Sequence, residues 1–174
     1  MGFIFETERL GVRKFETRDA EALYSIHLDD AVAKWFPNEC YKDIEEAKGA
    51  IDFYIKRVDE KRLPYVLAVE LKESGELIGD SGVSAVEGKE NEVEIGYVIS
   101  KRHTGKGYAT ELVRAVSEFM ASTFSAKVIY GRVIRGNDAS ARVLENSGFT
   151  FLGEDHGASD DPYGNGMLVY RKDT

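Results

Sequence analysis

Two glycines separated by one residue, Gly105 and Gly107, lie between a predicted strand and a predicted amphipathic helix that begins at Thr110. Glycine adopts left-handed backbone conformations without steric cost, so this segment can turn successive N–H groups toward one concavity. The unpaired N–H groups of the helix's first turn, and the positive end of its dipole, face the same space. Such a segment is suited to binding an anion, and phosphate or pyrophosphate is the best match.

Three kinds of phosphate-binding loop compete for this segment, and a strand-to-helix turn that binds nothing is a fourth interpretation. A nucleotide P-loop needs four residues between its glycines and then Gly-Lys-Ser/Thr, which the sequence lacks. A dinucleotide fingerprint needs glycine or alanine at position 110, where this chain has Thr110. It also needs an acidic residue at the end of the next strand, where this chain has Arg132 and Arg135. The third pattern, Q/R-x-x-G-x-G/A, matches residues 104–109, with threonine at its first position.

Composition predicts one globular domain spanning residues 1–174, with 43% hydrophobic and 31% charged residues. No apolar run approaches the roughly 20 residues of a membrane-spanning helix, and the N-terminus lacks the features of a signal peptide. Cys40 is the only cysteine, so neither an intrachain disulfide nor a thiolate zinc cluster can form, and we expect no metal site. We therefore expect a cytoplasmic protein with no membrane partner.

The formal net charge of −8 argues against a general nucleic-acid binder, which would need a basic face. An acidic protein can attract a cationic partner, such as an amine or a basic protein tail. The same acidity can also serve solubility alone. Charge therefore leaves the partner open, apart from the expectation that it is not a nucleic acid.

The hydrophobic pattern and the turn signals predict a mixed sheet. Strands are predicted at residues 10–14, 65–71, 77–86, 92–99, 128–133, 149–154 and 167–171. The strands at 92–99 and 128–133 should be parallel, because a helix links them. The last two strands should pair with each other around the polar loop that joins them.

Four helices are predicted from caps and helical spacing. The first has Thr17 as its N-cap and ends near residue 30. The second begins with a capping box formed by Asp43 and Glu46 and runs to about residue 62. The others cover residues 110–122 and 138–146. Together the elements predict an α+β fold in which helices flank a mixed sheet of about seven strands.

This order of elements, with the glycine loop between the fourth strand and the third helix, resembles the GCN5-related N-acetyltransferase (GNAT) fold over essentially the whole chain. Three further segments resemble the subgroup that contains the ribosomal-protein alanine N-acetyltransferases. They are Thr-Glu-Arg-Leu at 7–10 with Asp-Ala at 19–20, Glu-Ile-Gly-Tyr-Val at 94–98, and Asn-Asp-Ala-Ser at 137–140 with Gly-Phe at 148–149. The resemblance implies transfer of an acetyl group from acetyl-CoA to a primary amine, by direct attack in a ternary complex.

The resemblance also implies where acetyl-CoA would bind. In this family the fourth and fifth strands splay apart, and the pantetheine arm of the cofactor pairs with exposed strand backbone, here that of Val98, Ile99 and Ser100. Asn137 would hydrogen-bond the cofactor arm, cap the helix that follows it, or do both. The implied positions on the phosphate loop are Arg102, Thr104, Gly105, Lys106, Gly107, Tyr108, Ala109 and Thr110. Arg102 and Lys106, with Lys101, would either supply charge to the phosphates or form a solvated basic cluster.

The chemical step departs from the commonest family pattern. Many members carry a tyrosine seven residues after the asparagine, where its hydroxyl protonates the departing thiolate, but this chain has Leu144 there. Ser140, which lies one helical turn before Leu144, is the replacement candidate that the alanine-acetyltransferase subgroup implies. The alternative is that Ser140 is only a first-turn helix residue.

Glu94 is the first candidate for the general base, because the resemblance places it on the strand beside the thioester, where a carboxylate can take the amine proton. The alternative is an exposed sheet residue in a cross-strand ion pair. Residues 155–161, including His156, are further candidates, whereas His27 and His103 are expected to be surface or capping residues. A backbone N–H of Val98 or Ile99 would stabilise the oxyanion.

The acceptor is less well defined. At neutral pH about 10% of an α-amine is unprotonated, against about 0.04% of a lysine amine, so a site with only a weak base would favour a peptide N-terminus. The expected acceptor is a peptide or protein N-terminal α-amine, or a small amine. Trp35, Phe36, Tyr41 and Tyr54 either line the acceptor mouth or belong to the core. A homodimer is among the expectations from the family, although no segment identifies an interface.

Two other classes of function stay open. A coenzyme A-binding sensor or interaction module that has lost catalysis would explain Leu144 in place of the tyrosine. A nicotinamide-dinucleotide enzyme is disfavoured by the residues around the loop.

Overall fold

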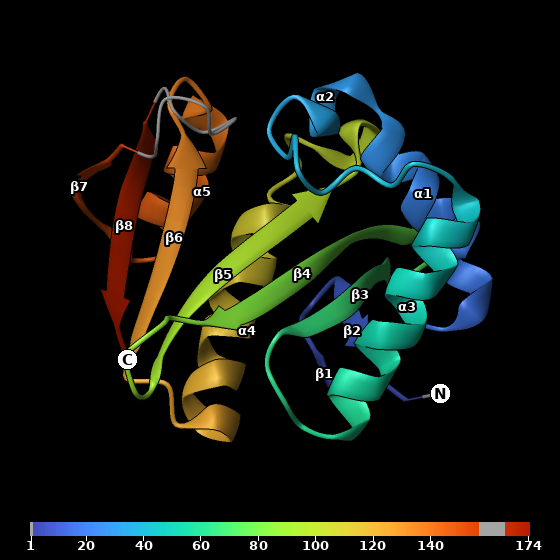
Figure 1. The fold of residues 1–174 in the computed structure, drawn as a ribbon, viewed down its shortest axis with the longest axis horizontal. Helices are drawn as coiled ribbons and strands as arrows, with labels where there is room; N and C mark the ends of the chain where they lie inside the picture. Colours follow the sequence, from blue (N-terminus) through green and yellow to red (C-terminus); the bar gives the residue numbers. More distant parts are fainter. Residues whose placement is uncertain (1, 157–165) are drawn as a thin grey trace. The chain divides into compact units, whose positions relative to one another are not determined.

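The computed structural model describes residues 2–156 and 166–174. Among them, eight strands form one sheet in the order β1-β2-β3-β4-β5-β6-β8-β7 (Figure 1). The strands are β1 (Phe5–Glu6), β2 (Leu10–Arg13), β3 (Tyr65–Leu71), β4 (Leu77–Ala85), β5 (Glu92–Ile99), β6 (Val128–Ile134), β7 (Thr150–Asp155) and β8 (Met167–Asp173). The α+β class with a mixed sheet is confirmed. The sheet has one strand more than predicted because β1, with two residues, is too short to carry an alternating pattern.

The helices follow the predicted segments, with corrections at their ends. They are η1 (Thr17–Asp19), α1 (Ala20–Leu28), α2 (Asp30–Ala33), α3 (Ile44–Asp59), η2 (Lys101–His103), α4 (Tyr108–Phe124) and α5 (Asp138–Asn146). The Asp43 carboxylate accepts the Glu46 N–H at 2.9 Å, so Asp43 is the N-cap of α3 as predicted, but the Glu46 carboxylate accepts from the Lys42 N–H, one residue before the position that a capping box requires. The Thr17 N-cap was wrong, because Thr17 opens a 3₁₀ turn and Asp19 stands at the N-cap position of α1.

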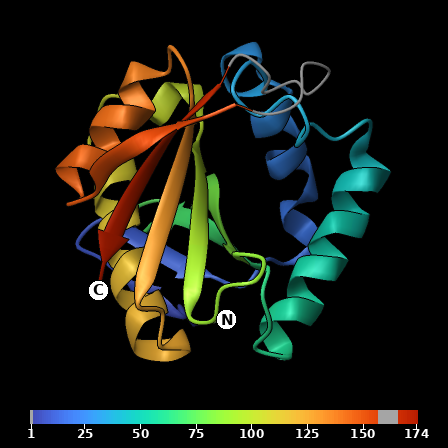
Figure 2. The same cartoon turned by 60° about the vertical axis from the view of Figure 1, so that its left-hand side comes forward.

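The chain divides into two compact units, Met1–Val83 with Tyr97–Ala109, and Ser84–Gly96 with Thr110–Thr174. In the first unit, α1 and α3 lie side by side and α3 packs against β3 (Figures 1 and 2). Their apolar faces enclose a cluster of buried residues. It comprises Phe15, Ala20, Leu23, Ile26, Val32, Ile51, Ala68, Leu77 and Val98.

The second unit is built on the pairing of β6 with β8 and of β8 with β7, against which α5 packs. Strands β5 and β6 are parallel, as predicted, and their register runs from Glu92 with Val128 to Ile95 with Gly131. The register with β6 ends at Ile95, whereas β5 continues to Ile99.

The end of β5 is held instead by β4, in the first unit. The Ser100 N–H donates to the Ile78 carbonyl at 2.7 Å. The Val98 carbonyl lies so close to Gly79 that a Cβ added there would come within 1.9 Å of its oxygen. Glycine at position 79 therefore allows β4 and β5 to approach, and a larger residue would force the strands to shift.

A buried ion pair joins β2 to the start of α1. The Arg13 guanidinium donates to both carboxylate oxygens of Asp19, at 2.7 and 3.0 Å, and to Glu70 at 2.6 Å. The hydrogen bonds to Asp19 raise the pKa of Arg13, and Glu70 adds to that effect against the opposing effect of burial. The Asp19 side chain also accepts the Glu16 N–H at 2.8 Å, so it fixes the turn that precedes α1.

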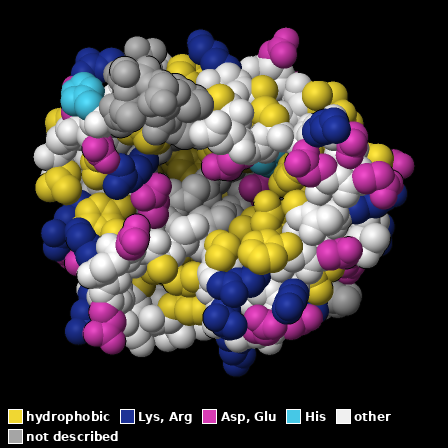
Figure 3. Space-filling view, in the orientation of Figure 1, with side chains coloured by type: hydrophobic (Ala, Val, Ile, Leu, Met, Phe, Trp, Pro, Cys, Tyr) yellow, Lys and Arg dark blue, Asp and Glu magenta, His cyan; other side chains and the backbone are white. Residues whose placement is uncertain are grey.

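In the described part of the chain, no helix has both the length and the apolar character that crossing a bilayer requires. Acidic and basic side chains are interspersed on the face shown in Figure 3. On that face the net negative charge of the chain is therefore not gathered into one patch.

The expectation that His27 and His103 are surface or capping residues was wrong, since their exposed fractions are 3% and 7%. His27 on α1 directs Nε2 to Asp80 at 2.8 Å and Nδ1 to the Glu39 carbonyl at 3.1 Å. Both partners accept hydrogen bonds, so only the imidazolium, which donates from both nitrogens, satisfies the two together. Burial lowers the pKa of His27, but the charge and hydrogen bond of Asp80, with help from Glu39, raise it above its ordinary value of 6.5.

We expect this pair to make stability depend on pH. Because the pKa of His27 is higher in the folded chain than in the unfolded chain, the stabilisation is complete below the unfolded pKa and is lost as pH rises through the folded pKa. Urea unfolding of wild type and His27→Gln, between about pH 6 and pH 9, should show a difference in unfolding free energy that shrinks as pH rises. His156→Gln, which changes an exposed histidine, is the control. A difference in unfolding free energy that stays constant or grows with pH would contradict a stabilising ion pair between His27 and Asp80.

Candidate active site

The glycine loop has the backbone conformation that its sequence predicts. Gly105 has φ +75° and Gly107 has φ +83°, both in the left-handed region that favours glycine. A Cβ at Gly105 would meet no atom within 4 Å, so this side of the loop is open space. The loop can therefore present its backbone to a ligand without a side chain in the way.

The helix after the loop begins two residues earlier than predicted, at Tyr108 rather than Thr110. Tyr108, Ala109 and Thr110 are thus residues of the first turn, where backbone N–H groups have no partner within the helix. The left-handed turn at Gly107 leads directly into that turn. Loop and helix start together supply the donors that an anion site needs.

The segment before the loop is fixed by short contacts. His103 is buried, and its Nδ1 lies 2.7 Å from the Ser100 hydroxyl. Burial lowers the pKa of His103, and the charges of Lys106 and Arg102 lower it further, against the opposing charge of Glu76. The Thr104 hydroxyl donates to the Lys101 carbonyl at 2.8 Å. These hydrogen bonds hold the 3₁₀ turn from which the loop starts.

The basic side chains near the loop have different surroundings. The Arg102 guanidinium is in an ion pair with Glu76, the residue just before β4. Lys106 is exposed and, among the described residues, its ammonium makes no ion pair or hydrogen bond. Between Arg102 and Lys106, Lys106 is the cation whose charge is available without breaking a contact.

The strand groups predicted to face pantetheine are all buried: Val98, Ile99 and Ser100. The Ser100 N–H is bonded to Ile78, and its carbonyl accepts the His103 N–H at 2.8 Å. Both backbone groups of Ser100 are thus used within the protein, which leaves Val98 and Ile99 as the strand positions to test.

In the second unit, Asn137 is the N-cap of α5, and its Oδ1 accepts the Ser140 N–H at 3.2 Å. The capping alternative is therefore realised, while the amide Nδ2 is the donor that remains for a ligand. Leu144 is 1% exposed and packs over Gly131 of β6, where a Cβ would lie 2.6 Å from its side chain. The residue in the tyrosine position is thus part of the core.

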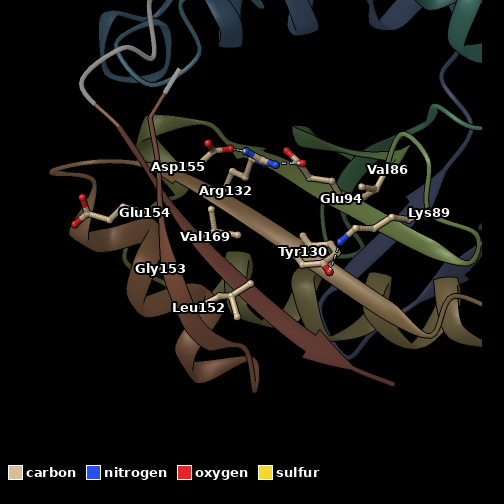
Figure 4. Close-up of a pocket in the computed structure, with 10 residues that line it drawn as sticks. All are labelled: Val86, Lys89, Glu94, Tyr130, Arg132, Leu152, Gly153, Glu154, Asp155 and Val169. Carbon is tan, nitrogen blue, oxygen red and sulfur yellow. Dashed lines mark hydrogen bonds and ion pairs between the residues drawn. The ribbon is translucent and has the colours of Figure 1, made fainter. Parts of the chain in front are cut away.

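Glu94 lines a pocket of about 340 Å³ that lies within the second unit (Figure 4). Arg132 on β6 lies between two carboxylates there: its Nε donates to Glu94 Oε2 at 2.9 Å, and its Nη1 pairs with Asp155. The cross-strand ion pair is thus present. In the part of the chain that the structure describes, the pair engages only Oε2 of Glu94. The pocket is lined by Val86, Lys89, Glu94, Tyr130, Arg132, Leu152, Gly153, Glu154, Asp155 and Val169.

Comparison with known proteins decides the family. The chain matches the family model of the acetyltransferase (GNAT) domain over residues 9–150. The chain belongs to the GNAT family. This GNAT chain is an acetyl-CoA-dependent N-acetyltransferase, since acetyl-CoA is the acetyl donor of that family.

Bacterial proteins are similar to this chain in sequence and in fold. The chain is 33% identical over 146 residues to the uncharacterized N-acetyltransferase YoaA of Bacillus subtilis, covering 84% of this chain and 82% of YoaA. A GNAT-family acetyltransferase structure from Bacillus anthracis has a TM-score of 0.80 at 26% identity, covering 97% and 96% of the two chains. The ribosomal-protein-S5-alanine acetyltransferase of Vibrio fischeri shares the fold, with a TM-score of 0.83 at 21% identity over 97% and 95% of the chains.

The remaining predictions for this acetyltransferase concern the aromatic residues, the other base candidates and metal binding. Tyr41 and Tyr54, with hydroxyls 3.2 Å apart, and Phe36 pack against the core cluster of the first unit, as the core interpretation requires. Trp35 is half-buried, with the Lys34 ammonium 4.4 Å from its ring centroid. Of the other base candidates, Asp155 pairs with Arg132, whereas residues 157–161 lie outside the described residues. No metal-binding group of side chains occurs among the residues described.

Sequence reasoning missed two arginines of this GNAT chain. Arg132 carried no role in the sequence analysis beyond its conflict with a dinucleotide site, yet it holds Glu94. Arg132 stands two residues after Tyr130, and Tyr130 pairs with Glu94 in the parallel register of β5 and β6. This spacing was the feature of the sequence that could have placed Arg132 near Glu94. Arg9, within the Thr-Glu-Arg-Leu segment, contacts the glycine loop, and no local pattern could show that contact.

Proposed function

We propose that this GNAT protein acetylates the α-amine of a peptide or protein N-terminus, or a small amine, by direct attack of the amine on acetyl-CoA in a ternary complex. The observation that carries the proposal is the loop with two left-handed glycines at the start of α4, in a chain of this family. We propose further that both compact units act as one domain, which the family match over residues 9–150 supports.

The loop fits the diphosphate of acetyl-CoA by its shape and donors. The open space beside Gly105 and the N–H groups of residues 107–110 suit a dianionic group, and Lys106 adds charge. The proposed phosphate contacts are Thr104, Gly105, Lys106, Gly107, Tyr108, Ala109 and Thr110, with Arg102 joining if it leaves Glu76. Val98 and Ile99 would pair with pantetheine, and Asn137 would donate from Nδ2.

Acetyl-CoA supplies an acetyl group activated as a thioester. We assign Glu94 as the base that takes the proton of the attacking amine on Oε1, while Arg132 holds the carboxylate through Oε2. Ser140, one helical turn before the buried Leu144, would donate a hydrogen bond to the departing thiolate sulfur. A backbone N–H of Val98 or Ile99 would stabilise the oxyanion.

The pocket around Glu94 supports an amine acceptor. Three of its lining residues carry carboxylates: Glu94 and Asp155, which both pair with Arg132, and Glu154, which pairs with Arg135. Arg132 engages Oε2 of Glu94, and Oε1 is the oxygen that would accept a hydrogen bond from an arriving ammonium ion. An α-amine is favoured over lysine because a larger fraction of it is unprotonated at neutral pH.

A second candidate function is coenzyme A binding without catalysis, by a sensor or interaction module. Leu144 in place of the acid and the pairing of Glu94 with Arg132 favour it. In that case the loop would bind coenzyme A, and no acetyl group would leave it.

The proposed function is tested by incubating the protein with acetyl-CoA and a panel of peptides, polyamines and small amines. Mass spectrometry should show acetylation at an α-amine or a small amine, together with release of free thiol. With that acceptor, Ser140→Ala should lower kcat about tenfold through the lost hydrogen bond to the thiolate, while the exposed control Ser122→Ala should match wild type. No product with any acceptor, despite tight binding of acetyl-CoA, would favour the binding module.

The cytoplasmic location and the homodimer are proposals of the same kind. The single cysteine supports a reducing compartment, because a lone thiol cannot form an intrachain disulfide. Light scattering of the purified protein would test the dimer.

A further inference from the structure

Arg9 reaches the glycine loop from the other end of the first unit's sequence. Its Nη1 donates to the Lys106 carbonyl at 2.9 Å, across a separation of 97 residues. Its guanidinium carbon lies 4.4 Å from the ring centroid of Tyr108, the first residue of α4. Its Nη2 lies 3.4 Å from the point where a Cβ would stand on Gly107. One side chain thus contacts Lys106 and Tyr108 and lies beside the residue between them, Gly107.

The backbone of Arg9 is itself held in place. Its carbonyl accepts the Lys72 N–H at 3.0 Å, one residue beyond the end of β3. Just beside it, the Thr7 hydroxyl accepts the Leu10 N–H at 2.9 Å, and the Thr7 N–H donates to the Leu10 carbonyl at 2.9 Å. The guanidinium therefore reaches the loop from a braced turn, so its contacts restrict the loop.

The hydrogen bond to Lys106 fixes one particular peptide group. In a trans peptide the carbonyl and the N–H of the next residue point in opposite directions, so holding the Lys106 carbonyl toward Arg9 turns the Gly107 N–H the other way. That N–H is one of the donors that precede the first turn of α4. Stacking on Tyr108, a cation–π contact, holds the following residue at the same time.

We propose that Arg9 is a positioning residue for the diphosphate of acetyl-CoA. It orients the peptide between Lys106 and Gly107 so that the Gly107 N–H stays turned toward the anion site. The proposal rests on the proposed function, in that the loop must bind the diphosphate. Arg9 thereby gives the Thr-Glu-Arg-Leu segment a part in cofactor binding.

Calorimetric titration with coenzyme A and with 3′-dephospho-coenzyme A tests this role without knowledge of the acceptor. Arg9→Met should weaken binding of both ligands about tenfold, because both carry the diphosphate and both lose the oriented donor. Arg9→Lys should recover most of the affinity, since its ammonium can still donate to the Lys106 carbonyl. Arg18→Met, which removes an exposed arginine from the same unit, should bind both ligands as wild type does.

A second readout separates orientation from a general loss of structure. In the free protein, the Gly107 amide resonance should move in Arg9→Met and return toward its wild-type position in Arg9→Lys. A loss of affinity for coenzyme A alone would make Arg9 a ligand of the 3′-phosphate and overturn the positioning role. Wild-type affinity in Arg9→Met would overturn it as well. If wild type bound neither ligand, the proposed function itself would fail, which is a different result.

Discussion

Replacing Glu94 with glutamine is expected to lower kcat about 100-fold, the usual contribution of a positioned general base, while the affinity for acetyl-CoA stays unchanged. Glutamine keeps the shape of the side chain and can still accept a hydrogen bond from Arg132, but it cannot take a proton. Steady-state kinetics with the acceptor found in the panel, together with calorimetry for acetyl-CoA, measure both effects.

Two further variants sharpen this prediction. Glu118→Gln changes an exposed glutamate on α4 and should leave kcat unchanged. Asp155→Asn removes the other carboxylate held by Arg132 and should have a small effect, because exposed ion pairs contribute little. If Asp155→Asn abolished turnover and Glu94→Gln did not, the base would be Asp155. If neither variant lowered kcat, the base would lie elsewhere.

Replacing Gly107 with valine is expected to weaken acetyl-CoA binding about 30- to 100-fold. At φ +83° a side chain costs about 1–2 kcal/mol, and a branched Cβ costs more. The new Cβ would also stand 3.4 Å from Arg9 Nη2, in van der Waals contact with the arginine that holds the loop. Each 1.4 kcal/mol is about a tenfold change in affinity. Titration calorimetry with coenzyme A measures the loss.

Matched glycines serve as controls for the Gly107 prediction. Gly88→Val imposes a similar strain, at φ +72° with no atom within 4 Å, in the turn between β4 and β5. It should lower stability and leave coenzyme A affinity unchanged. Gly105→Ala, at φ +75° with open space beside it, should lose only about tenfold because it meets no neighbour. Tight binding by Gly107→Val would show that the diphosphate lies elsewhere.

Local sequence signals predicted the elements that local chemistry decides. The bounds of β3, β5 and α5 agree with the structure, because alternation, helical spacing and capping are encoded within each segment. The left-handed glycines of the loop are also local, since no other residue takes that conformation at so low a cost. The wrong predictions have a local cause too. Strand β1 and helix α2 are too short to show a repeating hydrophobic pattern, and Thr17 begins a 3₁₀ turn rather than the helix.

By itself, the sequence determined that a strand, a glycine turn and a helix follow one another, and that the chain is a GNAT acetyltransferase. Only the tertiary structure decided that Arg9 holds Lys106, that Arg132 lies between Glu94 and Asp155, and that His27 is buried against Asp80. These partners come from segments that are far apart in the sequence, and only the folded chain brings them together. The hydrophobic pattern and the capping residues of one segment do not predict such a contact. Its energy depends on both side chains and on how deeply the two are buried where they meet.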